Sequence, residues 1–357
     1  MTIGQRRKKL EEMARGNGLS DAYTATLTRL KGQKGNKSAL GWKVLMWVLY
    51  SERPLRAEEL CHALGVEIGS ADLDPDNIPA LRTLVASCLG LVTIEASSSR
   101  VRLVHFTLQE HFLSNPTLFH CPHATIAEVF LTYLNSGSVK DLSPILHAAP
   151  STMPFLEYAS CYFGEHARKE ITENVKILAL RLLDKFDKHI SARLLLLHYE
   201  GNGSLGECWW THRGPTGFTA LDGASFIGEA EIMSSVLGMK RWDINRTNCT
   251  ENTALTWAAR KGYQEVVKML LEQEDVDPNW PGATYGPTPL SWAAEGGHEE
   301  IVKMLLAQEG VYPNWPGATY RPTPLSLAAK GGHEGIVKML LAQEGVHPDQ
   351  PDLIFSV

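Results

Sequence analysis

Histidine and cysteine occur together at positions 120–123, where the sequence reads His-Cys-Pro-His. These side chains could form half of a zinc site, which needs a second Cys or His pair at matching spacing. The rest of the sequence offers no such pair. His298-Glu299 and its copy at 333–334 begin like the metalloprotease motif HExxH, but Val302 and Val337 occupy the second ligand position. We therefore expect no metal site.

Two glycine-containing segments could bind phosphate or support hydrolysis. Residues 32–38 read Gly-Gln-Lys-Gly-Asn-Lys-Ser, but a phosphate loop needs a glycine directly before its lysine and a strand before the loop. Asn36 takes the place of that glycine and a helical pattern precedes it, so the segment is predicted to be a linker. Residues 223–228 miss the nucleophile motif GxSxG by one position. The sequence therefore predicts neither an enzyme nor a cofactor.

A repeated unit organises the C-terminal part of the chain, because equivalent leucines recur at 255, 290 and 325. In the middle copy Thr288 is suited to cap a first helix, and Pro289 fits its first position. Gly296-Gly297 is suited to end that helix, and the residues from Ile301 to Leu306 give a second helix an apolar stripe. One such helix pair cannot bury its own stripe, so the copies are expected to stack.

This unit resembles the ankyrin repeat, and a divergent first copy begins at Thr219-Ala220-Leu221. The period of 35 residues exceeds the usual length of about 33. The surplus lies in the connecting fingers, where Pro278, Pro281 and Pro287 weaken any β-ladder. The resemblance implies about four units that form an α-solenoid and bind a protein partner on the concave face.

Candidate partner-binding residues lie where the near-copies carry large or variable side chains. The segment Asn-Trp-Pro-Gly-Ala-Thr-Tyr occurs twice, at 279–285 and 314–320, and should project from the stack. The alternative is that each tryptophan packs on its neighbour's finger and stiffens it. The first helices differ between copies at two further positions. The predicted contact residues are Trp280, Trp315, Tyr285, Tyr320, Trp257, Trp292, Arg260, Glu295 and Lys330. Leu327 occupies the position in the last repeat that is equivalent to Trp257 and Trp292.

Three helices followed by a hairpin predict a winged-helix topology before the repeats. The helices are expected at 40–50, 57–64 and 78–89, and the strands at 91–96 and 101–106. Thr107 to Glu110 has the pattern of a capping box that opens a further helix. Residues 5–31 suggest two polar helices broken at Gly16-Asn17-Gly18, and residues 124–200 suggest a helical spacer with several apolar stripes.

These segments resemble the C-terminal part of fungal NACHT-ankyrin NOD-like receptors, without the NACHT ATPase. The resemblance rests on Leu40-Gly41-Trp42, on the segment 51–60, on residues 104–110 and on residues 155–166. In that family a winged-helix histidine senses ADP, and His105 stands at its place. Phe106 replaces the usual Asp, which favours a structural role for His105. Winged helices of this type are also associated with a GPI inositol-deacylase, a resemblance that transfers no catalytic residue.

Composition limits the possible partners. The chain has 357 residues, 44% of them hydrophobic, and a net charge of −6, which gives no general attraction for nucleic acid or anionic membranes. The third predicted helix offers only Arg82, and three aspartates precede it, which disfavours DNA binding. Six scattered cysteines and the lack of a long apolar run favour a cytoplasmic protein. The basic run Arg6 to Lys9 leaves a nuclear location open.

The sequence thus predicts a mostly α protein in which a winged-helix domain and a helical spacer precede an ankyrin-repeat α-solenoid. The predicted boundaries are 1–38 for an N-terminal helical segment, 39–115 for the winged helix, 116–212 for the spacer, 213–352 for the repeats and 353–357 for a tail. The predicted function is a scaffold that binds a protein partner, without a membrane, nucleic acid or small-molecule ligand. The alternatives are a nucleotide-responsive fragment that works with a separate ATPase, and a DNA-binding winged-helix protein.

Overall fold

The computed structural model describes residues 17–146, 148–200, 217–239, 242–248, 252–280, 287–314 and 322–346. The chain divides into two compact units. Unit 1 comprises the residues up to 136 together with 149–162, and unit 2 comprises 137–148 together with the residues from 163 onward. The predicted spacer, residues 116–212, is therefore shared between them. Among the described residues, no helix is both long and apolar enough to cross a membrane.

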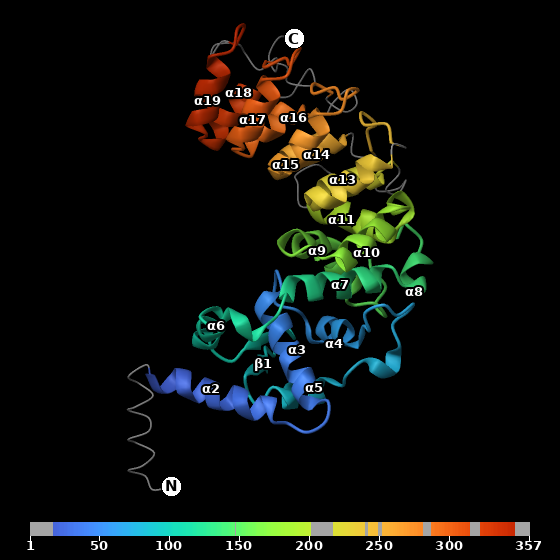
Figure 1. Ribbon diagram of the computed structural model, residues 1–357, viewed down its shortest axis with the longest axis vertical. Helices are drawn as coiled ribbons and strands as arrows, with labels where there is room; N and C mark the ends of the chain where they lie inside the picture. The colour runs from blue at the N-terminus through green and yellow to red at the C-terminus, as the bar shows by residue number, and fades with distance from the viewer. Residues whose placement is uncertain are drawn as a thin grey trace. The chain divides into compact units, whose positions relative to one another are not determined.

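Unit 1 contains the winged-helix topology (Figure 1). Its elements are α2 (Asn17–Lys31), α3 (Lys37–Tyr50), α4 (Ala57–Gly65), η1 (Pro75–Asn77), α5 (Leu81–Ser87), β1 (Val92–Ile94), β2 (Val101–Leu103), α6 (Phe106–Leu113), η2 (Pro116–Leu118) and α7 (Pro122–Leu134). The strands pair antiparallel, with Val92 opposite Leu103. Helix α3 contacts α2, α4, α5, α7 and β2. This central position explains why α3 is apolar nearly all round.

The core of unit 1 is aromatic. Trp47 of α3 is 2% exposed, and its ring meets those of Phe130 and Phe155 edge-on, at centroid distances of 5.5 and 5.8 Å. Edge-to-face contacts of this kind stabilise beyond the area that they bury. Phe130 belongs to the apolar stripe predicted on α7, and Ile126 and Leu134 of that stripe are also fully buried.

Several predicted boundaries in unit 1 were wrong by a few residues. The third helix begins at Leu81 and not at 78, because Pro79 disfavours helical geometry in the residue before it. The helical spacer expected from residue 124 begins earlier, with α7 at Pro122, which is accepted in the first turn because it needs no N–H there. The break expected at Gly16-Asn17-Gly18 is wrong for its last two residues, because α2 already begins at Asn17, and Gly16 lies outside the described residues. Both strands of the hairpin are shorter than predicted.

Unit 2 consists of helices. The helical segments before the repeats are α8 (Gly137–Lys140), α9 (Leu156–Lys169, whose first residues belong to unit 1), α10 (Glu173–Leu183), η3 (Phe186–Lys188) and α11 (Ile190–Glu200). The four helix pairs are α12 (Ala220–Ile227) with α13 (Ala230–Gly238), α14 (Ala254–Lys261) with α15 (Gln264–Leu271), α16 (Pro289–Glu295) with α17 (Glu299–Leu306), and α18 (Pro324–Gly331) with α19 (Glu334–Leu341). The stripe predicted on α10 is confirmed, since Val175, Leu178 and Leu182 are buried.

The predicted local chemistry of the repeats is confirmed. The hydroxyl of Thr288 accepts a hydrogen bond from the backbone N–H of Ser291 at 3.1 Å, and Pro289 follows it at the first helical position. Gly297 adopts φ +73°, a left-handed conformation that a side chain would strain. On α17 the side chains of Ile301 and Leu305 are fully buried. The stripe of this helix pair is therefore buried against the neighbouring repeats, as stacking requires.

Candidate partner-binding surface

The first helices of the repeats, α12, α14, α16 and α18, form one row, and the second helices form another (Figure 1). Neighbouring first helices make more extensive contacts than neighbouring second helices do. Small side chains permit this, because Ala258, Ala293 and Ala328 are fully buried where the helices meet. The closer spacing on one side bends the array toward the first helices, so their open face is the concave one.

Ring side chains that pack on glycines hold consecutive repeats in register. Tyr263, His298 and His333 each begin a second helix and cover a left-handed glycine of the preceding repeat, at Gly228, Gly262 and Gly297 respectively. A methyl group at Gly262 would lie 2.6 Å from Cε1 of His298. His298 Nε2 also donates to the carbonyl oxygen of Arg260 at 3.3 Å. These histidines therefore serve packing.

Asparagine side chains link the fingers in place of a β-ladder. The Asn245 amide donates to the carbonyl oxygen of Asp275 at 2.6 Å and accepts from the N–H of Asp277 at 2.8 Å. Asn279 repeats both bonds one unit later, with Gly310 and Tyr312. The sequence indicated that prolines would weaken strand pairing here, but it gave no hint that asparagines replace it. The base of each finger is thereby fixed to the next.

Arg260 and Trp292 form the most developed contact among the predicted binding residues. The Arg260 guanidinium lies over the Trp292 ring, 4.1 Å from its centroid, and 5.4 Å from that of Trp257. Trp292 is partly exposed, and its indole N–H has no hydrogen-bond partner among the described residues. Glu295 and Lys330, at the positions equivalent to Arg260, are exposed. The open face of the first helices therefore presents a stacked cation, an anion and a second cation in successive repeats.

Trp257 does not belong to this surface, so its assignment as a contact residue is corrected. Only 1% of the side chain is exposed, and its ring packs edge-on against Phe218 at 6.1 Å and beside Phe226 at 5.3 Å. The first repeat supplies both phenylalanines, which turn this tryptophan into core. The equivalent Trp292 has no such aromatic contact among the described residues and stays partly exposed. Leu327, in the last repeat, is 8% exposed and is likewise core.

Trp280 is the one predicted finger-tip residue that the described part of the chain includes. Its side chain is 42% exposed, as is expected for a contact residue and not for a buried stiffener. Tyr312, on the next finger, is 59% exposed and was not predicted. The Asn279 side chain joins the two fingers through the backbone N–H of Tyr312. Trp315, Tyr285 and Tyr320 lie outside the described residues.

His105 has a structural role in unit 1, as the sequence favoured. It is the N-cap of α6, where its Nδ1 accepts from the backbone N–H of Thr107 at 3.3 Å and lies 2.8 Å from the Thr107 hydroxyl. The predicted capping box at Thr107–Glu110 is therefore wrong, because the helix starts earlier. The Thr107 hydroxyl also meets the Tyr23 hydroxyl at 2.7 Å, which ties α2 to α6.

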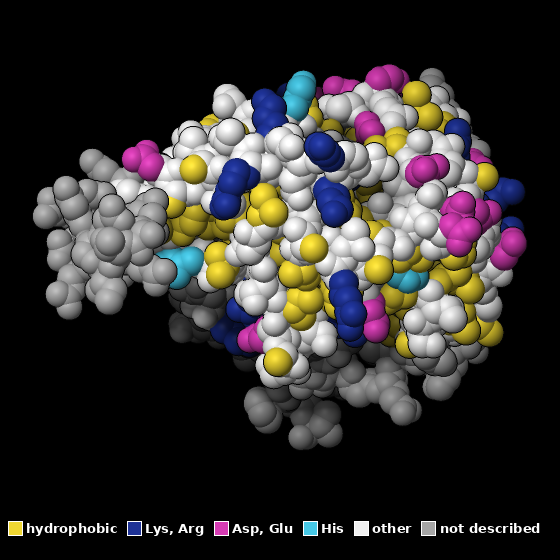
Figure 2. All heavy atoms as spheres, turned by 90° about the horizontal axis from the view of Figure 1, so that it is seen from below, with side chains coloured by type: hydrophobic (Ala, Val, Ile, Leu, Met, Phe, Trp, Pro, Cys, Tyr) yellow, Lys and Arg dark blue, Asp and Glu magenta, His cyan; other side chains and the backbone are white. Residues whose placement is uncertain are grey.

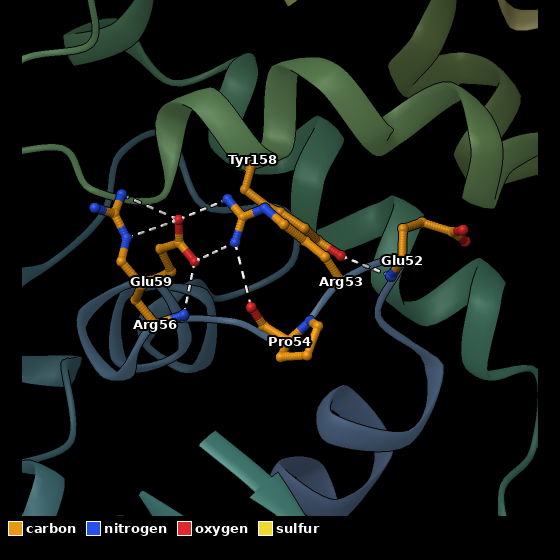
Figure 3. Close-up of polar contacts among 6 residues, drawn as sticks. All are labelled: Glu52, Arg53, Pro54, Arg56, Glu59 and Tyr158. Carbon is orange, nitrogen blue, oxygen red and sulfur yellow. Dashed lines mark hydrogen bonds and ion pairs between the residues drawn. The ribbon is translucent and has the colours of Figure 1, made fainter. Parts of the chain in front are cut away.

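A buried ionic network at the start of α4 is the main polar feature of unit 1 (Figure 3). Glu59 has no exposed side-chain surface, and both its oxygens accept from Arg53, at 2.8 and 2.9 Å. The N–H of Arg56 donates to Glu59 at 2.8 Å. Burial raises the carboxyl pKa, but these donors outweigh it and hold the pKa of Glu59 below its usual value. The Arg53 guanidinium also lies 4.6 Å from the Tyr158 ring centroid.

The ring hydroxyl of Tyr158 extends this network to the preceding loop, because it accepts from the N–H of Glu52 at 2.8 Å (Figure 3). Both oxygens of Glu59 accept hydrogen bonds from within the protein. A buried carboxylate with a full set of donors is stable but has no capacity left for a substrate. We therefore assign the network to folding: it fixes the segment 155–162 on α4.

Asp222 and Lys261, both in unit 2, are among the ionisable groups whose pKa is displaced by burial. Burial raises the pKa of Asp222 to about 6, although Thr219 and Asn248 donate hydrogen bonds to it. Burial lowers the pKa of Lys261 to about 8. Its Nζ lies 3.5 Å from the centroid of the Tyr199 ring and 4.4 Å from that of Phe226. Lys261 thus joins α14 to α11 through ring faces.

Unit 1 contains a run of exposed cations before α4. Residues 22–51 contain five basic and no acidic side chains. All five are exposed: Arg29, Lys31, Lys34, Lys37 and Lys43. Figure 2 shows Lys and Arg side chains spread over the middle of this end of the molecule, with Asp and Glu gathered toward one side. The predicted recognition helix α5 adds only Arg82.

Comparison with family models finds two kinds of domain in the chain. A model for ankyrin repeats matches in three overlapping copies, at residues 191–281, 220–317 and 277–352. A model described as the GPI inositol-deacylase winged helix domain matches residues 27–120. A search of curated proteins finds no match. Domains of these two kinds are in general not catalytic. The chain therefore carries a winged-helix domain of the GPI inositol-deacylase type followed by ankyrin repeats.

Proposed function

We propose that this protein is an interaction scaffold that binds a protein partner on the concave face of its repeats. The observation that carries the proposal is the Arg260–Trp292 stack, in which a part-exposed indole and a guanidinium share an open face. Arginine and tryptophan are the side chains that most often dominate binding energy at protein interfaces. Glu295 and Lys330 continue the same face with the residues in which near-identical repeats differ.

Exposed aromatics on the fingers extend this surface. Trp280 and Tyr312 lie on adjacent fingers that Asn279 holds together, so their separation is fixed before binding. Such preorganisation lowers the entropic cost of association. We include Trp315, Tyr285 and Tyr320 in the proposed surface on the evidence of the sequence alone.

The partner is expected to be basic. Residues 217–357 carry 18 acidic and 10 basic side chains, whereas residues 1–216 carry 22 acidic and 24 basic ones. The net charge of the repeat region is thus −8, which would speed the encounter with a positively charged surface. Because such steering is screened by salt, capture of the partner should weaken as ionic strength rises.

The finer assignment follows the resemblance in the sequence. We infer that the chain corresponds to the C-terminal part of a fungal NACHT-ankyrin receptor and works in the cytoplasm as a sensor or adaptor. What supports this is the order of the parts, in which a winged-helix domain precedes a helical segment and ankyrin repeats. A fragment that responds to nucleotide is less favoured, because His105 is engaged as a helix cap.

The proposal is tested by affinity capture from native cytosol with paired variants. Arg260→Glu combined with Trp292→Ala should abolish capture of a partner that the wild-type chain retains in a saturable manner. The matched control is Lys303→Glu with Lys338→Glu, which changes exposed residues of the second helices. The control should capture normally. Equal loss in both double variants, or no loss in the first, would contradict a concave binding face.

A further inference from the structure

Unit 1 contains a cavity of about 460 Å³ between α2, α3 and the segment from α6 to η2. Its lining residues are Thr24, Leu27, Thr28, Lys31, Trp42, His111, Asn115, Thr117 and Leu118. The four residues of α2 in this set are spaced by three or four positions, so they share one face of the helix. The volume lies within the range of small-molecule sites in proteins.

Hydrogen bonds at both ends of α2 fix the width of the cavity. At one end the Tyr23 hydroxyl meets that of Thr107 at 2.7 Å, and Ser20 Oγ lies 3.2 Å from Nδ1 of His111. Beyond the other end, Gln33 Nε2 donates to the carbonyl oxygen of Ser87 at 2.7 Å. These bonds fix the position of α2 relative to α6 and to the end of α5. A cavity held open in this way is available to a ligand.

Three of the nine residues that line the cavity are apolar, and one of them has a flat ring. Leu27 and Leu118 contribute aliphatic surface, and Trp42 contributes its indole. The Trp42 ring rests edge-on against Phe119 at 5.6 Å, and Phe119 in turn packs against Phe112 at 5.7 Å. This backing holds the indole in one orientation. A planar hydrophobic group is the complement to such a wall.

The polar groups of the cavity favour an anion. Lys31 forms no ion pair among the described residues, and His111 uses only Nδ1 in the hydrogen bonds described. Among the described residues, no carboxylate lines the cavity. The stretch from 22 to 51 has five cations and no acid, which adds a positive field around it. Cations without local counter-charges beside an apolar wall suit a ligand with one acidic group.

We propose that this cavity binds a small acid with a flat aromatic body, with the ring against Trp42 and the acidic group at Lys31. Nothing in the sequence motifs pointed to this site, because its residues come from three separate segments. It lies within unit 1 and involves none of the residues of the concave face, so it is independent of the partner-binding surface. The sequence prediction that no small molecule is bound is revised by this proposal.

Calorimetric titration of the full chain with 2-naphthoate tests the proposal, with 2-naphthamide and inorganic phosphate as comparison ligands. We expect saturable binding of one naphthoate per chain and binding of the neutral amide that is weaker by about ten-fold, the effect of losing one charge-assisted contact. Inorganic phosphate, which lacks the ring, should give no saturable heat. Phosphate that binds as tightly as naphthoate would overturn the assignment of the aromatic wall.

Paired variants locate the site. Lys31→Glu should weaken naphthoate binding by about ten-fold or more, whereas Lys34→Glu, an exposed lysine outside the cavity, should change it by less than about two-fold. Thr28→Trp fills the cavity from an exposed position and should abolish binding while circular dichroism stays unchanged. Equal losses in the two lysine variants, undiminished binding in Thr28→Trp, or no saturable binding to the wild type would each refute the proposal.

Discussion

In the repeat array the same contact of a ring on a glycine occurs in successive repeats, whereas the polar contacts described for the winged-helix unit each occur once. Gly228, Gly262 and Gly297 each meet the ring of the next repeat in the same way. Repetition makes the exceptions visible: Arg260, Glu295 and Lys330 differ where nearly everything around them is copied. In unit 1 the network around Glu59 has no second copy, so no internal comparison marks its residues as special.

The two regions also differ in charge and in their cavities. A cavity of about 580 Å³ in unit 2 is lined by Trp242 together with Asp243, Glu272, Glu274 and Asp275. The charged or titratable side chains that line the cavity beneath α2 are Lys31 and His111, with no carboxylate in the part of the chain that the structure describes. Charged groups of one sign at a site select ligands of the other sign. We therefore propose a basic partner for the repeats and an acidic ligand for unit 1.

The largest expected effect on stability tests the stacking of the repeats. Leu305 is fully buried on the stripe between repeats, so Leu305→Ala should lower the free energy of unfolding by about 2–5 kcal/mol. Lys303→Ala, on the exposed side of the same helix, is the control and should change it by less than about 0.5 kcal/mol. Urea unfolding measures both. A Leu305→Ala protein as stable as the control would show that the stacking account is wrong.

A matched pair of glycines separates backbone strain from packing between repeats. Gly262 and Gly332 end the first helices of two repeats at φ +76° and +73°. A Cβ at Gly262 would meet His298 at 2.6 Å, whereas nothing lies within 4 Å of one at Gly332. Gly332→Ala should therefore cost only the strain of a left-handed alanine, about 1 kcal/mol, and Gly262→Ala should cost about 1–2 kcal/mol more.

The His298→Ala exchange provides the check on that pair. In the Gly262→Ala background it removes the ring that the new methyl group would strike, so it should recover part of the lost stability. If the two glycine variants unfold at the same urea concentration, the rings that cover the glycines do not hold the repeats in register.

We predict that Lys261 makes the stability of the protein depend on pH. The later repeats have glycine at the equivalent position and lack this effect. Its pKa is about 8 in the folded protein, below the ordinary value of 10.5, because burial disfavours the charged form. Between those two pH values the unfolded chain binds more protons than the folded chain does, so the free energy of unfolding should rise as pH increases from about 8 to 10.5. Lys261→Met should remove this slope and, net of the lost cation–π contacts, raise stability at pH 7 by about 1 kcal/mol.

Thermal unfolding between pH 7 and 10 makes this measurement, with Lys268→Met as the control because Lys268 is exposed on the second helix of the same repeat. A Lys261→Met protein that keeps the slope, or that loses stability at pH 7, would show that the ring contacts outweigh the cost of burial.

The smallest expected effect on stability belongs to the finger tips. Trp280→Ala together with Trp315→Ala should leave the far-UV spectrum and the melting temperature nearly unchanged, because Trp280 is already 42% exposed. Capture of the partner should nevertheless be lost. A large drop in melting temperature with capture retained would assign these residues to structure instead.

The fold could be predicted from the sequence wherever a pattern has a direct local cause. Thr288 and Pro289 determine a helix start through one hydroxyl and one missing N–H, and the stripe from Ile301 to Leu306 determines the buried side of α17. The start of α6 was misplaced, because a histidine cap uses a side chain that helix caps rarely employ. Local patterns gave the order of the elements more reliably than their ends.

The site was harder to predict, because exposure depends on the neighbours that folding brings together. Trp257 and Trp292 occupy equivalent positions, yet Phe218 and Phe226 bury the first and leave the second partly open. The cavity beneath α2 escaped prediction for the same reason, since Lys31, Trp42 and His111 are far apart in the sequence. Sequence periodicity identifies which residues vary, but only packing decides which of them can touch a partner.

Hydrogen exchange of the chain with and without its captured partner tests the central claim most directly. Binding on the concave face predicts slower amide exchange in α14, α16 and α18 and in the adjoining fingers at Trp280 and Tyr312. It predicts little change in α15, α17 and α19. Protection confined to the second helices, or to unit 1 alone, would contradict the assignment of the concave face as the binding surface.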